Sequence, residues 1–234
     1  AAYLLSMGLS TAVLFVGQEI NGSRRWLNFG PLSFQPSEFA KAAVILFLTW
    51  QIQGSKKTTA GFWFMCRTML TLLPIVGLVG SNNLSTAIII LGIGVILIFI
   101  SDPGYARFVG MGVTGAAVIA VFLAAESYRL ERLAIWRNPE KYEKGFQTIQ
   151  GLYAIGSGGL FGRGFGSSLQ KLGFVPEAQN DMIFSIICEE LGLTGAFFLI
   201  GIFGLLMWRL MVIALHCREL QGTLLCVGIM SHMA

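Results

Sequence analysis

The chain has 234 residues, of which 55% are hydrophobic and only 12% are charged. A soluble globular domain averages roughly 25% charged residues, so this composition excludes an ordinary water-soluble domain and indicates a protein of the bilayer. The net charge of +4 suits nearby anionic lipid and gives no support for nucleic acid as a partner.

Apolar runs of bilayer-spanning length follow one another along the chain, since about 20 such residues cross a hydrocarbon core. They predict an all-α fold, a polytopic helical integral membrane protein with six to seven spans. Because residue 1 is not Met and the last run is cut off at Ala234, we expect an internal fragment of a longer protein. The predicted spans are Tyr3–Val16, Phe39–Ile52, Ala60–Gly80, Leu84–Ser101, Phe108–Ala125, Ile186–Met207 and a last one from about Leu224.

The short loops predict the orientation. The loop that contains Lys56, Lys57 and Arg67 has no acidic residue, which places it in the cytoplasm by the positive-inside rule. Alternation from there places residues 18–37 outside, together with a large extracellular loop at residues 126–185. We interpret residues 1–234 as a single transmembrane domain that contains this loop.

Histidine and cysteine give little support for a site outside. The same alternation puts His216 and His232 on or near the cytoplasmic side, so the most common general base is not expected in the outer loops. The four cysteines have neither zinc-ligand spacing nor an obvious disulfide framework.

The first polar segment outside is "NGSRRWLNFGPLSFQPSEFAK", residues 21–41. Its "QPSE" opens a helix, because Pro36 suits a first turn and Glu38 complements the positive helix end. Lys41 lies three residues after Glu38, on the same face. A lysine inside a membrane helix needs a partner, so we expect Lys41 beside Glu38, as a structural ion pair, or beside an anionic ligand.

The second polar segment is the large loop, with its glycine-rich part "GFQTIQGLYAIGSGGLFGRGFG". We expect a helix at Phe146–Ile155 followed by a flexible turn. Glycines let the backbone approach a ligand and present amides to an anion. The spacing matches neither GxGxxG nor GxxxxGK[ST], so a nucleotide-phosphate loop is not supported. Without a histidine here, a serine triad has little support either.

Four of the 12 acidic residues lie in "VPEAQNDMIFSIICEELG", residues 175–192. Asp181 precedes an apolar helix and is either its N-cap or a general base. Glu189 and Glu190 lie further in, where an isolated carboxylate is protonated or paired. We interpret both as members of structural ion pairs, and for one of them the expected partner across the bundle is Lys41, Arg25 or Arg129.

Three segments resemble, in the same order, the signature segments of the SEDS family of FtsW, RodA and SpoVE proteins. They are "GSRRWLNFGPLSFQPSEFAK", "GFQTIQGLYAIGSGGLFGRGFGSSLQK" and "VPEAQNDMIFSIICEELG". "SNNLSTAIII" and "EAQND" are more similar to the division branch in clostridium-like Gram-positive bacteria than to the elongation branch. On the family's frame of about ten helices, the chain begins near the third and ends inside the ninth.

The resemblance implies a peptidoglycan glycosyltransferase that polymerises lipid II on the outer face of the cytoplasmic membrane during cell division. Asp181 takes the position of the family's general base, and undecaprenyl diphosphate is the leaving group. Departure of the diphosphate needs positive charge, which a divalent cation, Mg²⁺ or Mn²⁺, could share with the basic side chains, although no carboxylate cluster has a clear metal-site pattern. The expected substrate-binding residues are Arg25, Glu38, Lys41, Arg129, Gln147, Lys171 and Glu177.

The implied partners are lipid II, a class B penicillin-binding protein, other divisome membrane proteins and the bilayer. The chain departs from the family at Asn82 and Asn83, where many members have Pro-Asp; an aspartate-to-cation pair at that position would be neutralised here. Two other functions stay open, a lipid II flippase and a non-catalytic divisome scaffold. A flippase needs polar groups along the whole transbilayer path, and the charges here gather at the outer end.

Overall fold

The computed structural model describes residues 1–20, 23–29, 32–55, 61–102, 104–106, 108–113, 115, 117, 134–142, 145–174 and 178–234. They divide into two compact units. The first unit comprises Ala1–Val113 and Met207–Ala234, and the second comprises Thr114–Leu206.

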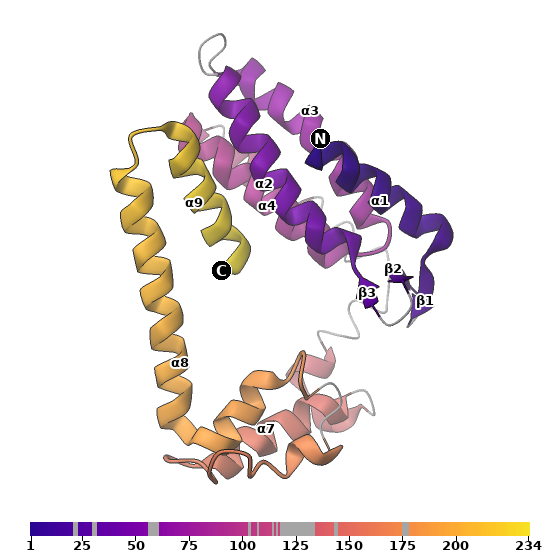
Figure 1. Cartoon of the computed structure of the whole chain (residues 1–234), viewed down its shortest axis with the longest axis vertical. Helices are drawn as coiled ribbons and strands as arrows, with labels where there is room; N and C mark the ends of the chain where they lie inside the picture. Colours follow the sequence, from indigo (N-terminus) through magenta and orange to yellow (C-terminus); the bar gives the residue numbers. More distant parts are fainter. Residues whose placement is uncertain are drawn as a thin grey trace. The chain divides into compact units, whose positions relative to one another are not determined.

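Five helices build the first unit: α1 (Ala2–Val16), α2 (Pro36–Ser55), α3 (Phe62–Gly80), α4 (Leu84–Ser101) and α9 (Leu220–Met233). α1 packs on α2, α3 packs on α4, and α9 lies against both α2 and α4 (Figure 1). Their shared core is apolar, and because lipid tails are as apolar as these side chains, close van der Waals packing holds the core together. Fully buried members are Leu48, Leu72, Ile75, Ile90, Leu97 and Leu224.

A small antiparallel sheet connects α1 to α2. Its strands are β1 (Gln18–Ile20), β2 (Ser23–Phe29) and β3 (Leu32–Phe34), in the order β1-β2-β3. Leu27 of β2 is buried, and β2 contacts both α1 and α2. The sequence indicated only turns in this segment, so the sheet is an addition to a fold that is otherwise helical.

The second unit contains a helical turn at residues 134–137, the 3-10 turns η1 (Pro139–Lys141) and η3 (Gln170–Leu172), and the helix α7 (Phe146–Gly158). α8 (Ile183–His216) begins in this unit and continues past Leu206. The predicted helix at Phe146–Ile155 is confirmed as α7, which extends three residues further.

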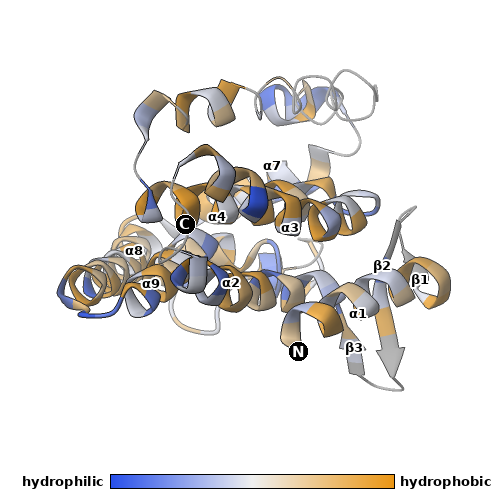
Figure 2. Cartoon of the chain, turned by 90° about the horizontal axis from the view of Figure 1, so that it is seen from above, coloured by the Kyte–Doolittle hydropathy of each residue, from blue (hydrophilic) through white to orange (hydrophobic). Residues whose placement is uncertain are grey.

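Among the described residues, three helices are long and apolar enough to cross a membrane: α3, α4 and α8. Apolar residues dominate these helices in Figure 2. α4 has the predicted bounds, α2 extends three residues further than predicted at each end, and α8 begins three residues earlier and ends nine residues later than predicted. Of the span predicted at Phe108–Ala125, residues 108–113, 115 and 117 are described and all are helical; the rest lies outside the described residues.

A tight turn at residues 81–83 joins α3 to α4. Asn83 is the N-cap of α4, and its side-chain oxygen accepts a hydrogen bond from the Thr86 amide at 3.3 Å. Arg25 reaches the same turn, where its Nε donates to the backbone carbonyl of Asn82 at 2.9 Å. Asparagine and aspartate cap helices about equally well, so this position keeps its capping role without the family's negative charge.

We expect Asn83→Ala to lower the stability of the protein by about 1 kcal/mol, because the Thr86 amide loses its acceptor. Asn83→Asp should leave stability unchanged or raise it slightly, since a carboxylate also complements the positive helix end. Thermal unfolding of both variants in the same detergent checks this, and an equal loss in both would contradict the capping role.

Candidate functional site

α8 is broken at Gly192, where φ is 67° and ψ is −164°. Only glycine adopts this backbone conformation readily, and a Cβ on Gly192 would lie 2.3 Å from the amide of Gly162. Because of the break, backbone amides and carbonyls on both sides of Gly192 lose their partners within the helix. Backbone groups of the glycine-rich loop after α7, at residues 159–164, bind them in place of those partners. Its bonds run from Arg163 N to Glu189 O (3.0 Å), Gly164 N to Glu190 O (3.0 Å), Leu193 N to Gly159 O (2.9 Å) and Thr194 N to Leu160 O (3.1 Å).

The carboxylate of Glu189 is completely buried and binds the same loop. Oε1 accepts from the Leu169 amide at 3.3 Å and from Nη1 of Arg163 at 3.4 Å. Oε2 accepts from the Ser168 hydroxyl and from the Gln170 amide, the latter at 3.3 Å. Each oxygen therefore has two donors, which is how a buried charge becomes tolerable.

Glu190 binds the other end of the loop. Oε1 accepts from Nζ of Lys171 at 2.7 Å and from the Ser168 amide at 3.4 Å, and Oε2 accepts from the Gly166 amide at 2.9 Å. Nζ of Lys171 also donates to the Gly166 carbonyl at 2.7 Å. Amides that the sequence suggested for an external anion thus bind the chain's own carboxylates.

The ion-pair partners of the two glutamates differ from those suggested by the sequence. Glu189 pairs with Arg163 and Glu190 with Lys171, both from the loop that precedes α8. Neither pairs with Lys41 or Arg25, and Arg129 lies outside the described residues. Lys171 was expected to bind substrate, but here its charge is matched by Glu190. Arg163 and Ser168 were missed, because only the backbone pairing across the break brings residues 163–171 to this part of α8.

Asp181 differs from both glutamates. It is exposed and lies before the helix, which begins at Ile183, so residue 182 and not Asp181 occupies the N-cap position. No described residue donates a hydrogen bond to its carboxylate. Gln147, in the first turn of α7, is half-buried, and Glu177 lies outside the described residues.

α7 supports the start of α8 through a face of small residues. Gly151, Ala154 and Gly158 are buried and lie on one side of the helix. A Cβ on Gly158 would lie 1.9 Å from the backbone carbonyl of Cys188, whereas one on Gly151 would meet side-chain atoms, Met182 Cε at 2.1 Å and Ser185 Oγ at 3.2 Å. The two helices are therefore in backbone contact at Gly158, just before Glu189.

In the first unit, Lys41 is buried and its Nζ lies 2.8 Å from Oε2 of Glu38, as the helical spacing predicted. His232 of α9 lies within electrostatic range of both. The sequence predicted His232 on or near the cytoplasmic side, away from Lys41; the structure instead brings the two within electrostatic range, because α9 begins at Leu220 and packs against α2.

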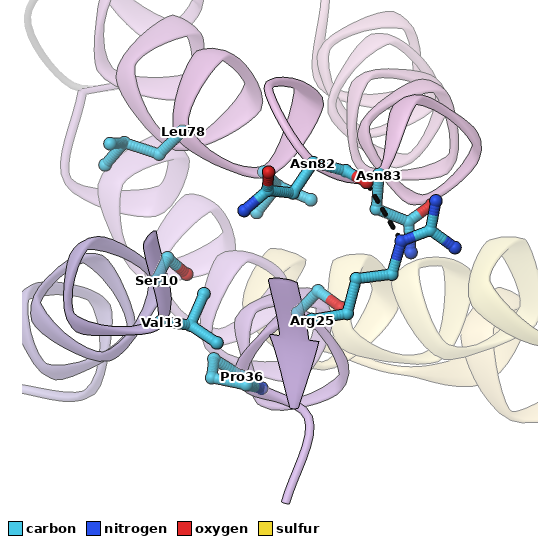
Figure 3. A pocket seen from close by; sticks show the side chains of 9 residues that line it. Ser10, Val13, Arg25, Pro36, Leu78, Asn82 and Asn83 are labelled. Carbon is cyan, nitrogen blue, oxygen red and sulfur yellow. Dashed lines mark hydrogen bonds between the residues drawn. The ribbon is translucent and has the colours of Figure 1, made fainter. Parts of the chain in front are cut away.

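Arg25 lies beside a small cavity between α1, α2 and the α3–α4 turn (Figure 3). The cavity measures about 20 Å³, enough for one water molecule but not for a sugar or a diphosphate. Ser10 is buried in its wall and has no hydrogen-bond partner among the described residues. Apart from Nε, the guanidinium of Arg25 makes no hydrogen bond within the described part of the chain.

Within the described residues, no three His, Cys, Asp or Glu side chains form a group that could hold a metal ion. Arg25, Glu38 and Lys41 belong to the first unit, and Gln147, Lys171 and Asp181 to the second.

A family model described as the FtsW/RodA/SpoVE cell cycle proteins matches residues 1–234. The stage V sporulation protein E of Bacillus subtilis is 37% identical over 229 residues, which cover 94% of this chain and 61% of that protein. A probable peptidoglycan glycosyltransferase FtsW of Saccharophagus degradans is 37% identical over 222 residues, covering 92% of this chain and 57% of the relative. Equal identity to a sporulation and a division protein does not separate the branches.

Solved structures of similar fold include a chain from a study of polymerization and crosslinking by a peptidoglycan synthase complex. Its TM-score is 0.77 at 31% identity, over 99% of this chain and 65% of that one. The rod shape determining protein RodA of Thermus thermophilus has a TM-score of 0.65 at 29% identity, over 99% of this chain and 60% of its own. The chain thus spans about three fifths of the length of these proteins.

We expect Glu189→Gln to lower the free energy of unfolding by about 1–3 kcal/mol. Each carboxylate oxygen faces two donors, so either placement of the glutamine amide sets its NH₂ against two of them. Denaturant or thermal unfolding of the full-length protein measures the loss. Glu140→Gln, at an exposed carboxylate, is the control, and equal stability of the two variants would contradict the burial of a charge at Glu189.

Gly158→Ala should also destabilise the protein, because the new methyl group collides with the Cys188 carbonyl. Gly156→Ala, two residues earlier in the same helix with nothing within 4 Å of its Cβ position, should be neutral or stabilising by up to about 1 kcal/mol. The difference between the two melting temperatures is the measurement, and identical values would argue against close contact of α7 and α8.

Proposed function

Because the chain belongs to the FtsW/RodA/SpoVE family of cell cycle proteins, we propose that its full-length protein polymerises lipid II into glycan strands. Asp181 is the proposed general base. In this reaction the 4-hydroxyl of an acceptor sugar attacks the anomeric carbon of a lipid-linked donor. The new glycosidic bond forms as the bond to undecaprenyl diphosphate breaks, and Asp181 takes the hydroxyl proton.

The state of Asp181 is the observation that carries this proposal. Of the three described carboxylates at residues 178–192, those of Glu189 and Glu190 are fully engaged with the glycine-rich loop. The carboxylate of Asp181 is exposed and accepts no hydrogen bond from described residues. A base must be able to reach the proton that it takes, and Asp181 meets that condition. The structure gives no support for the alternative role of Asp181 as a simple cap.

Departure of a diphosphate requires positive charge, which preorganised cations provide in many transferases. Arg25 is the best candidate among the described members of the expected substrate-binding set, because only its Nε is engaged. Lys41 and Lys171 are each within 2.8 Å of a carboxylate oxygen, so their charge is already matched. They can help only by sharing their donors between that carboxylate and the substrate. Arg129 and a divalent cation stay candidates on the resemblance alone.

The proposed reaction takes place on the outer face of the cytoplasmic membrane, beside a class B penicillin-binding protein and other divisome membrane proteins. The positive-inside loop at residues 54–67 supports this orientation. The relative named as a probable peptidoglycan glycosyltransferase and the solved peptidoglycan synthase complex support the activity and the existence of a partner. Division, in preference to elongation or sporulation, rests on sequence resemblance.

Buried polar groups between the helices of the first unit do not favour a flippase. Thr71 donates to the side-chain oxygen of Gln51 at 2.9 Å, and the Tyr3 hydroxyl donates to the Thr71 carbonyl. These groups therefore satisfy one another across α1, α2 and α3, as polar residues between membrane helices often do. They are bonds between helices and do not form a continuous polar path.

We expect Asp181→Asn to lower the rate of lipid II polymerisation by roughly 10²- to 10⁴-fold, the usual contribution of a general base. The measurement uses the full-length protein with its penicillin-binding partner, and glycan strands are resolved by gel electrophoresis. Melting temperature and co-purification with the partner should not change, because the side chain is exposed and makes no hydrogen bond or ion pair with described residues.

Glu140→Gln is the matched control and should polymerise at the normal rate, since Glu140 is an exposed carboxylate elsewhere in the loop. Normal polymer from Asp181→Asn would overturn the role of Asp181. Transbilayer movement of labelled lipid II by a protein that makes no polymer would favour the flippase. Dispensability of Asp181 for division in cells would favour the scaffold.

A further inference from the structure

The loop at residues 159–174 exposes an unusual number of large apolar side chains. Phe161 and Phe165 are 81% and 88% exposed, and four neighbours are each more than half exposed. Soluble surfaces rarely gather such side chains in one short segment, and a gathering of this kind marks a contact with lipid or protein. The six residues are Leu160, Phe161, Phe165, Leu169, Leu172 and Phe174.

The depth of this loop is fixed by its bonds to α8. The bonds of Gly159 and Leu160 to the amides of Leu193 and Thr194 attach it just where the apolar run of α8 begins. Residues 193–208 contain no charge, and at 1.5 Å per residue they extend roughly 24 Å, most of a hydrocarbon core of about 30 Å. A loop bonded to the first residues of this run lies at the boundary between hydrocarbon and head groups.

We propose that the loop at residues 159–174 is a lipid anchor. Its phenylalanine and leucine side chains enter the interfacial layer of the bilayer at the N-terminal end of the apolar run of α8. The anchor does not depend on the proposed enzymatic activity. Lipid covers the apolar side chains of the loop, because the loop is bonded to the start of a membrane-spanning helix.

The charges of the loop fit this occupant. Residues 159–174 include Arg163 and Lys171 and no acidic residue. The side chain of Arg163 is 40% exposed, so its stem can lie beside the apolar side chains while the guanidinium reaches a lipid phosphate. Glu189 and Glu190 would repel anionic head groups, but the first is buried and the second is paired with Lys171. Basic and aromatic residues together are typical of interfacial anchors.

The test places an environment-sensitive fluorophore on the loop. In full-length protein with its native cysteines replaced, Phe165→Cys and, in a separate variant, Phe161→Cys are labelled and reconstituted without partner into vesicles of phosphatidylcholine and phosphatidylglycerol. Glu140→Cys, at an exposed polar position, is the control. Quenching by lipids with a nitroxide high on the acyl chain is compared with quenching by aqueous iodide.

We expect the ratio of lipid to aqueous quenching to be several-fold higher at positions 161 and 165 than at position 140. Equal ratios at all three positions in folded protein would overturn the anchor. Protection of positions 161 and 165 from both quenchers would also overturn it, because the patch would then be covered by protein. Two labelled positions keep the test decisive if one variant fails to fold.

Discussion

The binding of two adjacent carboxylates at the start of a membrane span is the constraint on which the second unit depends. Glu189 and Glu190 come just before the apolar run of α8, where an unpaired charge would cost several kcal/mol. The loop at residues 163–171 supplies amides, a hydroxyl and two cations to them. This loop can approach because α8 breaks at Gly192, and the break is stable because the loop takes over the lost backbone bonds. The break in α8 and the bound loop therefore depend on each other.

The same arrangement supports the proposed division of roles among the acidic residues. A carboxylate that organises a loop needs many fixed donors, whereas one that removes a proton needs access to its substrate. Glu189 and Glu190 meet the first condition, and Asp181 meets the second while its backbone is held next to α8. The contact of α7 with α8 at Gly158 adds to this support. Functional groups work best on rigid elements whose own positions are fixed by packing. Asp181 has an exposed side chain on a backbone that is supported in this way.

Much of the helical fold could be predicted from the sequence, because long apolar runs between turn residues leave few alternatives. α4 is the clearest case, with an uncharged run that begins after Asn83 and ends before Asp102. The pair of Glu38 and Lys41 could also be predicted, since their spacing on one helix makes them neighbours.

The partners of Glu189 and Glu190 could not be predicted, because they depend on a tertiary contact between a loop and a helix break. Gly192 was visible in the sequence, but a glycine within an apolar run is compatible with an unbroken helix. The strands β1 to β3 were missed for a related reason, since short strands between turn residues carry little periodic signal.

The position of Asn83 shows how a departure from a family pattern can be neutral in structure and still change chemistry. The cap of α4 needs an acceptor oxygen, which asparagine supplies as well as aspartate. What asparagine does not supply is a negative charge at the turn that Arg25 also reaches. An aspartate there would compete for the guanidinium, whereas asparagine leaves the charge of Arg25 unmatched by the described residues. The substitution therefore preserves the fold of the turn and increases the capacity of Arg25 to bind an anion. In the proposed reaction, this is the property that departure of the lipid diphosphate would require.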